Sequence, residues 1–116
     1  CIIYCQFNSI KSQFDGGAIV IKLTNINGVK NFIDRCIFTK CQSTNGGAIY
    51  FKIEKNLSTH IENSEFKQNK ADSINMNPSG GAIYASSTIR NNFAIKNCTF
   101  NQNYAAFYGG SIYFSN

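Results

Sequence analysis

Apolar and polar residues alternate over short segments of this chain, and each such segment follows a pair of glycines. In one of them Ile49 and Phe51 flank Tyr50. A period of two places the two apolar side chains on one face of a β-strand. No 3.6-residue apolar period is present, so the pattern predicts short strands and no amphipathic helices.

The sequence contains four copies of one unit, each marked by two glycines, a small residue and Ile. The spacings between the glycine pairs are 30, 34 and 29 residues. The glycine pairs are Gly16 and Gly17, Gly46 and Gly47, Gly80 and Gly81, and Gly109 and Gly110, and they precede Ile19, Ile49, Ile83 and Ile112.

Three further columns of like residues repeat upstream of the glycines. Each copy has a Phe before its glycine pair, a small residue two positions before that Phe, and an Ile five positions before it. These columns are Phe7, Phe38, Phe66 and Phe100; Cys5, Cys36, Ser64 and Cys98; and Ile2, Ile33, Ile61 and Ile95.

A unit of about 30 residues can be a helical pair, a propeller blade or one coil of a β-helix. The glycine pair would break a helix, and the unit has too few strands for a blade. We therefore predict an all-β fold, a right-handed parallel β-helix of about four coils with three short strands per coil. Residues 1–116 form a single segment of it.

In this fold, like residues stack in columns, and the Phe and Ile columns named above form the core ladder. The glycine pairs serve as structural turns, because glycine accepts positive φ and lets one coil approach the next. Alternation places Asp34, Glu62 and Lys96 in one exposed column.

The paired GGAI and FxxN motifs resemble the repeats of the polymorphic outer-membrane-protein (Pmp-like) family of surface proteins. FxxN is complete from Phe66 to Asn69 and from Phe100 to Asn103, whereas Ile10 and Cys41 stand at the Asn position of the first two copies. The resemblance implies a right-handed β-helix, an extracellular or cell-surface location, and adhesive or structural duties.

Composition agrees with an all-β chain, since Asn and Ile occur sixteen times each and Leu only twice. The net charge of +5 is spread along the chain and suggests weak attraction to acidic polysaccharide. No basic stripe with aromatics indicates nucleic-acid binding, and no apolar stretch reaches the roughly 18 residues of a membrane span. The expected partners are further copies of the same repeat and glycans.

Two features are candidates for binding. Tyr50, Tyr84 and Tyr113 form an outward column that either binds sugar rings or a neighbouring filament, or serves only to stabilise itself. The third unit has an insertion at 72–78, which is either a binding loop or an insertion without function.

No catalytic signature is evident, so we expect no enzyme activity, no cofactor and no metal. His60 is the only histidine, and it is expected to lie on the surface with no Ser, Cys or carboxylate beside it. A carbohydrate-cleaving β-helix, which would need clustered carboxylates, remains an alternative.

The five cysteines show no zinc spacing. Cys5 and Cys36 are neighbours, but parallel stacking disfavours a disulfide between them, so the cysteine column is expected to consist of buried thiols. Cys1 and Cys41 remain able to pair outside the chain. The sequons at Asn56 and Asn97 are expected glycosylation sites.

Both ends of the sequence fall within a unit, which predicts exposed apolar rungs and strand edges. We expect either an excerpt of a longer repeat protein or a subunit that stacks into filaments.

Overall fold

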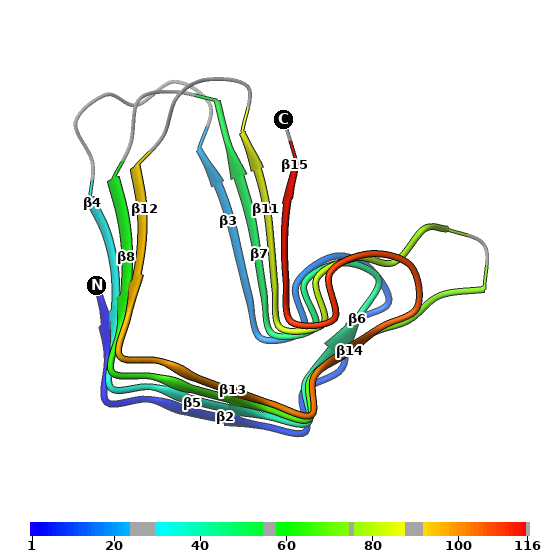
Figure 1. Ribbon diagram of the computed structural model, residues 1–116, viewed down its shortest axis with the longest axis horizontal. Helices are drawn as coiled ribbons and strands as arrows, with labels where there is room; N and C mark the ends of the chain where they lie inside the picture. The colour runs from blue at the N-terminus through cyan, green and yellow to red at the C-terminus, as the bar shows by residue number, and fades with distance from the viewer. Residues whose placement is uncertain (24–29, 55–57, 75, 88–91, 116) are drawn as a thin grey trace.

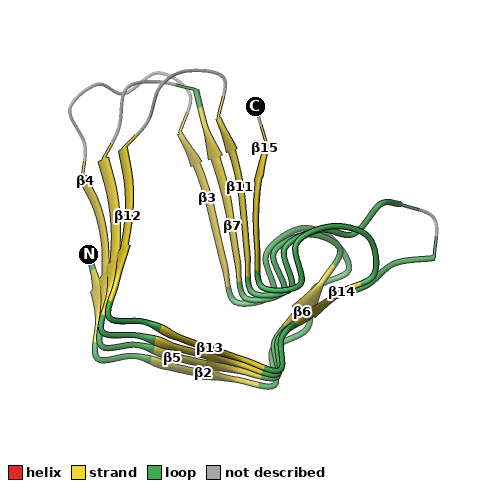
Figure 2. Cartoon of the chain, in the orientation of Figure 1, coloured by secondary structure: helices red, strands yellow, loops and turns green. Residues whose placement is uncertain are grey.

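The computed structural model is a parallel β-solenoid, as the sequence predicted, and it describes residues 1–23, 30–54, 58–74, 76–87 and 92–115. The described residues contain strands and turns and no helix that could cross a membrane (Figure 2). Seen along the stack, successive coils lie one behind another and form three walls (Figure 1).

The strands form four parallel sheets. The first sheet contains β1 (Ile2–Ile3), β4 (Lys30–Asp34), β8 (Ser58–Glu62) and β12 (Asn92–Lys96). The second contains β2 (Gln6–Asn8), β5 (Ile37–Thr39), β9 (Glu65–Lys67) and β13 (Thr99–Asn101). The short third sheet contains β6 (Gln42–Ser43), β10 (Lys70–Ala71) and β14 (Tyr104–Ala105). The fourth contains β3 (Ile19–Leu23), β7 (Ile49–Ile53), β11 (Ile83–Ser87) and β15 (Ile112–Ser115).

Two details of the prediction change. The chain makes about three turns where the sequence suggested about four coils, because four stacked strands are separated by only three turns. The second, third and fourth repeats also have a fourth strand in addition to the three expected, whereas the first repeat has only an isolated bridge at Lys11. These extra strands are two residues long, too short for an alternating pattern to reveal them.

The core contains ladders of Phe and of Ile side chains that lie in register between coils. Phe38 pairs with Phe7 on one side and Phe66 on the other, and neighbouring rings are stacked with their centroids 4.8 Å apart. This distance equals the spacing of neighbouring strands. Ile49 and Ile83 pair in the same way and are fully buried.

The two glycines of a pair have different structural roles, as Gly46 and Gly47 show. Gly46 has φ +63°, which glycine adopts without a steric penalty. Gly47 lies so close to the next coil that a Cβ there would be 2.1 Å from the carbonyl oxygen of Gly81. The first glycine turns the chain, and the second permits close stacking.

The other two corners of each coil use residues with side chains. Between β4 and β5, Arg35 has φ 51°, and between β5 and β6, Lys40 has φ 55°. Such left-handed conformations are disfavoured for non-glycine residues and persist only where the surroundings impose them. The same conformation recurs in every coil, at Tyr4, Asn63 and Asn97 for the first corner and at Ser9, Gln68 and Gln102 for the second.

Candidate functional site

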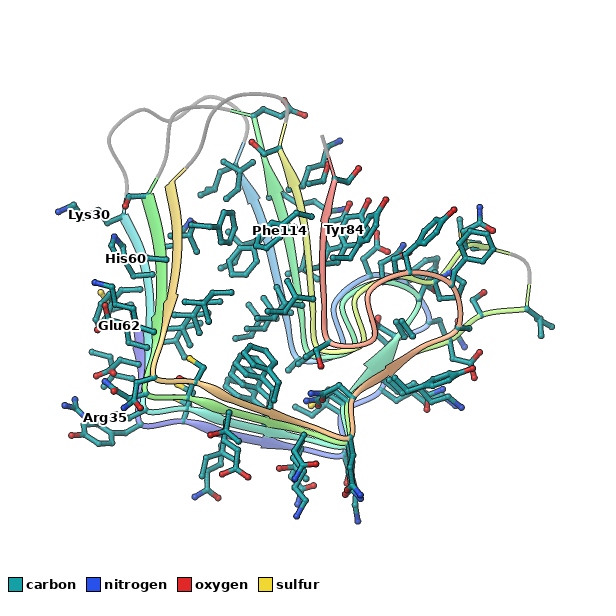
Figure 3. All side chains as sticks on the ribbon, viewed as in Figure 1. Lys30, Arg35, His60, Glu62, Tyr84 and Phe114 are labelled. Carbon is teal, nitrogen blue, oxygen red and sulfur yellow. The ribbon has the colours of Figure 1, made fainter. Side chains whose placement is uncertain are left out.

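The tyrosine column lies on the outer face of the β3, β7, β11 and β15 sheet. Figure 3 shows Tyr84 pointing away from the interior, whereas Phe114 on the adjacent coil points into it. The rings of Tyr50 and Tyr84 are stacked with centroids 5.0 Å apart, and Tyr84 and Tyr113 are tilted with centroids 5.4 Å apart. The sequence-predicted column is thus assembled by the fold.

The contacts between neighbouring tyrosine rings determine which ring atoms a ligand can reach. The faces of its rings contact one another, so a ligand that approaches the sheet meets ring edges and hydroxyl groups. Burial raises the pKa of Tyr50, with smaller contributions from the charges of Asp15 and Tyr84, and keeps the phenol neutral. Lys22 adds a positive charge, because its Nζ lies 5.9 Å from the centre of the Tyr50 ring.

The insertion in the third unit swings outward between β10 and β11, beyond the path of the other coils (Figure 1). Ile74 is 98% exposed and Met76 is 64% exposed. Pro78 is buried and anchors the end of the insertion, and its carbonyl oxygen accepts a hydrogen bond from the Phe107 amide. Position 75 lies outside the described residues.

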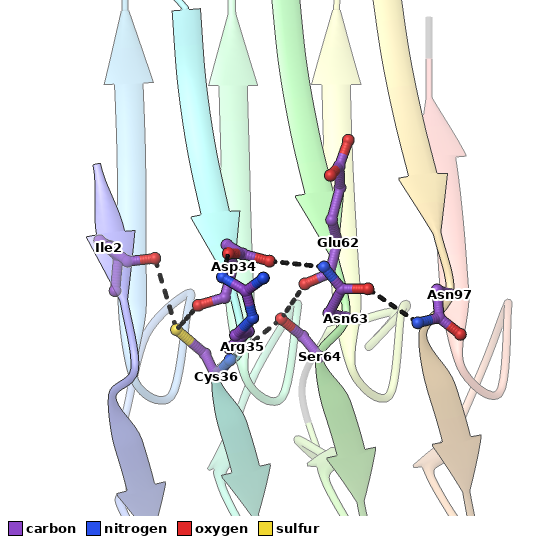
Figure 4. Close-up of polar contacts among 8 residues, drawn as sticks. All are labelled: Ile2, Asp34, Arg35, Cys36, Glu62, Asn63, Ser64 and Asn97. Carbon is purple, nitrogen blue, oxygen red and sulfur yellow. Dashed lines mark hydrogen bonds and ion pairs between the residues drawn. The ribbon is translucent and has the colours of Figure 1, made fainter.

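A polar ladder follows the corner between the first two sheets (Figure 4). Asp34 accepts hydrogen bonds from Arg35 at 2.6 Å and from the Asn63 side chain at 2.8 Å. Asn63 in turn accepts one from the Asn97 amide at 2.7 Å. The expectation that Asp34 is exposed is wrong: it is 5% exposed, because Arg35 and Asn63 cover it.

The two predicted glycosylation sites are Asn97 and Asn56. Asn97 is exposed at this corner with φ 51°, and its amide nitrogen is engaged with Asn63. Asn56 lies outside the described residues. Glycosylation of Asn97 therefore stays a prediction, as does that of Asn56.

The prediction that His60 has no serine or carboxylate beside it is wrong. The hydroxyl of Ser58 is 2.8 Å from His60 Nε2, and Glu62 Oε1 is 3.9 Å from His60 Nδ1. All three side chains lie on the outer face of β8, because Thr59 and Ile61 between them are fully buried. The signal was in the sequence, since residues at i, i+2 and i+4 of one strand share a face.

The cysteines in the small-residue column act as thiols that donate to main-chain carbonyl groups. Cys36 Sγ is 3.4 Å from the oxygen of Ile2 and 3.3 Å from that of Asp34 (Figure 4). All five cysteines are free in the structure. Burial raises the pKa of Cys36, and likewise that of Cys41, which is fully buried. Cys5 and Cys98 are half-buried.

No group of three or more His, Cys, Asp or Glu side chains that could hold a metal ion occurs within the described ranges. His60 and Glu62 form a pair, and the neighbouring Asp34 carboxylate is occupied by Arg35 and Asn63. The described part of the chain therefore offers no ligand set for a structural metal.

The fold and its columns define a repeat protein of the parallel β-helix class. The family model of the Chlamydia polymorphic membrane protein (Chlamydia_PMP) repeat matches residues 63–86. This segment contains both motifs of the third copy, FxxN at Phe66 and GGAI at Gly80, so the predicted Pmp-like repeat is confirmed there. The match supports a cell-surface location in general terms. No curated protein and no solved structure matches the chain.

Proposed function

We propose that this chain is a structural or adhesive module, extracellular or at a cell surface, either within a longer repeat protein or as a unit of a filament. The observation that carries the proposal is the coil-to-coil register: the Phe7 to Phe100 ladder fills the interior with side chains. A packed interior leaves the regular outer faces as the surfaces available for contact.

The repeat family supports the location, since its model describes a membrane protein repeat. Further copies of the same repeat are the natural partner, because each coil buries the apolar rungs of its neighbours. Extended arrays of this kind provide long, regular surfaces for contact.

Antibody labelling of intact source cells tests the location. We expect labelling before permeabilisation, and labelling only after permeabilisation would contradict the proposal.

Beads coated with the folded chain test adhesion, and beads coated with the Gly47→Val variant serve as the control because that substitution disrupts stacking. Equal adhesion by both kinds of bead would contradict an adhesive role for the solenoid. Electron microscopy of the purified chain tests self-association through stacks along the solenoid axis.

The second candidate is carbohydrate binding by Tyr50, Tyr84 and Tyr113. The outward column and the ammonium group of Lys22 near Tyr50 favour it. The test is depletion of an acidic polysaccharide from solution by the immobilised protein. We expect Tyr84→Ala to reduce depletion. The exposed Tyr4, which lies at the corner between β1 and β2 and outside the column, provides the control Tyr4→Ala. Equal depletion by both variants would contradict a role for the column.

A further inference from the structure

We propose that Ser58, His60 and Glu62 form an esterolytic site on the outer face of β8, in which Ser58 is the nucleophile. Three chemical roles meet on one strand: a hydroxyl, an imidazole within hydrogen-bond distance of it, and a carboxylate at the other ring nitrogen. The separations are 2.8 Å between Ser58 Oγ and His60 Nε2 and 3.9 Å between His60 Nδ1 and Glu62 Oε1.

The carboxylate sets the protonation pattern of the ring. A proton on Nδ1 is favoured because that nitrogen faces Glu62, and Nε2 is then free to accept the hydrogen bond from Ser58. This is the arrangement in which a histidine removes a proton from a serine hydroxyl and a carboxylate stabilises the resulting imidazolium.

The neighbouring strands complete the surroundings of the site. Lys30 on β4 is the register partner of Ser58, is exposed, and projects to the same side as His60 and Glu62 (Figure 3). Its ammonium group places positive charge on the face where an oxyanion would develop. Phe32, the partner of His60 on β4, adds apolar surface with its ring 6.4 Å from the imidazole.

The strand on the other side of His60 is β12. Its partner on β12 is Ala94, whose side chain is small, so an acyl group has access to the imidazole from that side. Among the described residues of these strands, the other charged groups on this face are Asp34 and Lys96, the two partners of Glu62. Asp34 is engaged by Arg35 and Asn63, which leaves Glu62 as the carboxylate beside His60.

The substrate class is a carboxylic ester with a good leaving group, such as an aryl ester. Ser58 Oγ forms a bond to the acyl carbon while its proton passes to His60 Nε2. The bond from the acyl carbon to the alkoxy oxygen breaks, and His60 returns the proton to the departing alcohol. Water then attacks the acyl-serine, gives its proton to His60, and releases the carboxylic acid with regeneration of the Ser58 hydroxyl.

A fluorophosphonate probe tests the proposal on the whole chain, because it reacts with activated serines by forming a P–O bond and releasing fluoride. Peptide mass spectrometry would locate the modified residue. Ser9 provides an internal control: it is exposed, and its hydroxyl donates to Asn8 with no histidine in contact. We expect modification of Ser58 well ahead of Ser9, and equal rates would overturn the proposal without the need for any variant.

Three substitutions refine the test. Ser58→Ala should abolish the modification at this strand, and His60→Gln should slow it by about a hundredfold, the lower range for a positioned general base. Glu62→Gln should slow it less, because it leaves the base in place. Modification of Ser58 that is unchanged in a folded His60→Gln variant would overturn the proposal.

Discussion

The side chain of Asn69 donates a hydrogen bond of 3.0 Å to the main-chain oxygen of Phe38, one coil earlier in the stack. Its amide oxygen accepts a hydrogen bond, also 3.0 Å, from the main-chain nitrogen of Cys41. Asn103 repeats the arrangement one coil later, with its amide donating to Phe66 and accepting from Asn69. The Asn of FxxN thus joins the third copy to the second and the fourth copy to the third.

Asn69→Ala should lower the free energy of unfolding by about 2 to 3 kcal/mol. Asn69 is fully buried, so its removal leaves the Cys41 amide and the Phe38 carbonyl group without their partner. Urea unfolding followed by circular dichroism measures the change. Asn101→Ala is the matched control because Asn101 is exposed, and a loss of similar size there would contradict the role of the ladder.

Cys41→Asn should stabilise the protein by about 1 kcal/mol, the net worth of an intramolecular hydrogen bond. Cys41 occupies the Asn column but contributes only weak thiol contacts, 3.7 Å from the oxygens of Phe7 and Thr39. An Asn at this position would donate to Phe7 and extend the ladder by one coil. Thermal unfolding gives the measurement.

Cys36→Asn is the control for that substitution. Cys36 is equally buried but lies in the small-residue column, where Ser64 is its neighbour and no amide ladder exists. It should destabilise the protein, because a larger polar side chain would enter a packed site. A loss of stability in Cys41→Asn equal to that in Cys36→Asn would show that position 41 cannot join the ladder.

Gly47→Ala should destabilise the fold by more than about 4 kcal/mol, the range reached only by severe disruptions. Its Cβ would lie 2.1 Å from the Gly81 oxygen and 2.6 Å from the Lys70 nitrogen, and both are main-chain atoms that cannot move aside cheaply. Gly110→Ala is the same substitution at the same position of the repeat, yet its Cβ would meet only the Asn103 oxygen at 3.8 Å. It should be tolerated, and similar melting temperatures for the two variants would refute the close-approach explanation.

Alkylation by iodoacetamide near neutral pH should modify Cys1 rapidly and Cys41 only after unfolding. Cys1 is exposed, whereas burial both shields the Cys41 thiol and raises its pKa, so little thiolate forms. The same shift makes stability fall as the pH rises above the pKa of an unfolded thiol, because the unfolded chain then releases a proton that the folded chain retains. Modification of Cys41 in the folded protein at the rate of Cys1 would contradict this burial.

The ladder residues could be predicted from the sequence because register is encoded in spacing. Phe38 and Phe66 sit at the same position of the repeat, and the fold only has to stack one copy on the next. The burial of Asp34 could not be predicted in this way. Alternation places it on the outer face, and its cover comes from Arg35 and Asn63, whose left-handed conformations no pattern of apolar residues reveals.

The surroundings of His60 could be predicted from the sequence only in part. The spacing of Ser58, His60 and Glu62 along one strand was visible, but the hydrogen bond between Ser58 and His60 depends on side-chain rotamers that spacing does not specify. The two-residue strands, such as β6, could not be predicted from the sequence either, because only their pairing with the next coil defines them.

The central claim is that identical positions of successive repeats lie directly over one another, and nuclear Overhauser effects between phenylalanine rings test it most directly. The centroids of Phe38 and Phe66 are 4.8 Å apart, and those of Phe66 and Phe100 are 4.9 Å apart. We predict cross-peaks for both of these pairs and a far weaker one, or none, between Phe38 and Phe100, which are two coils apart. The absence of a Phe38–Phe66 cross-peak in the folded protein would contradict the stacked-coil structure.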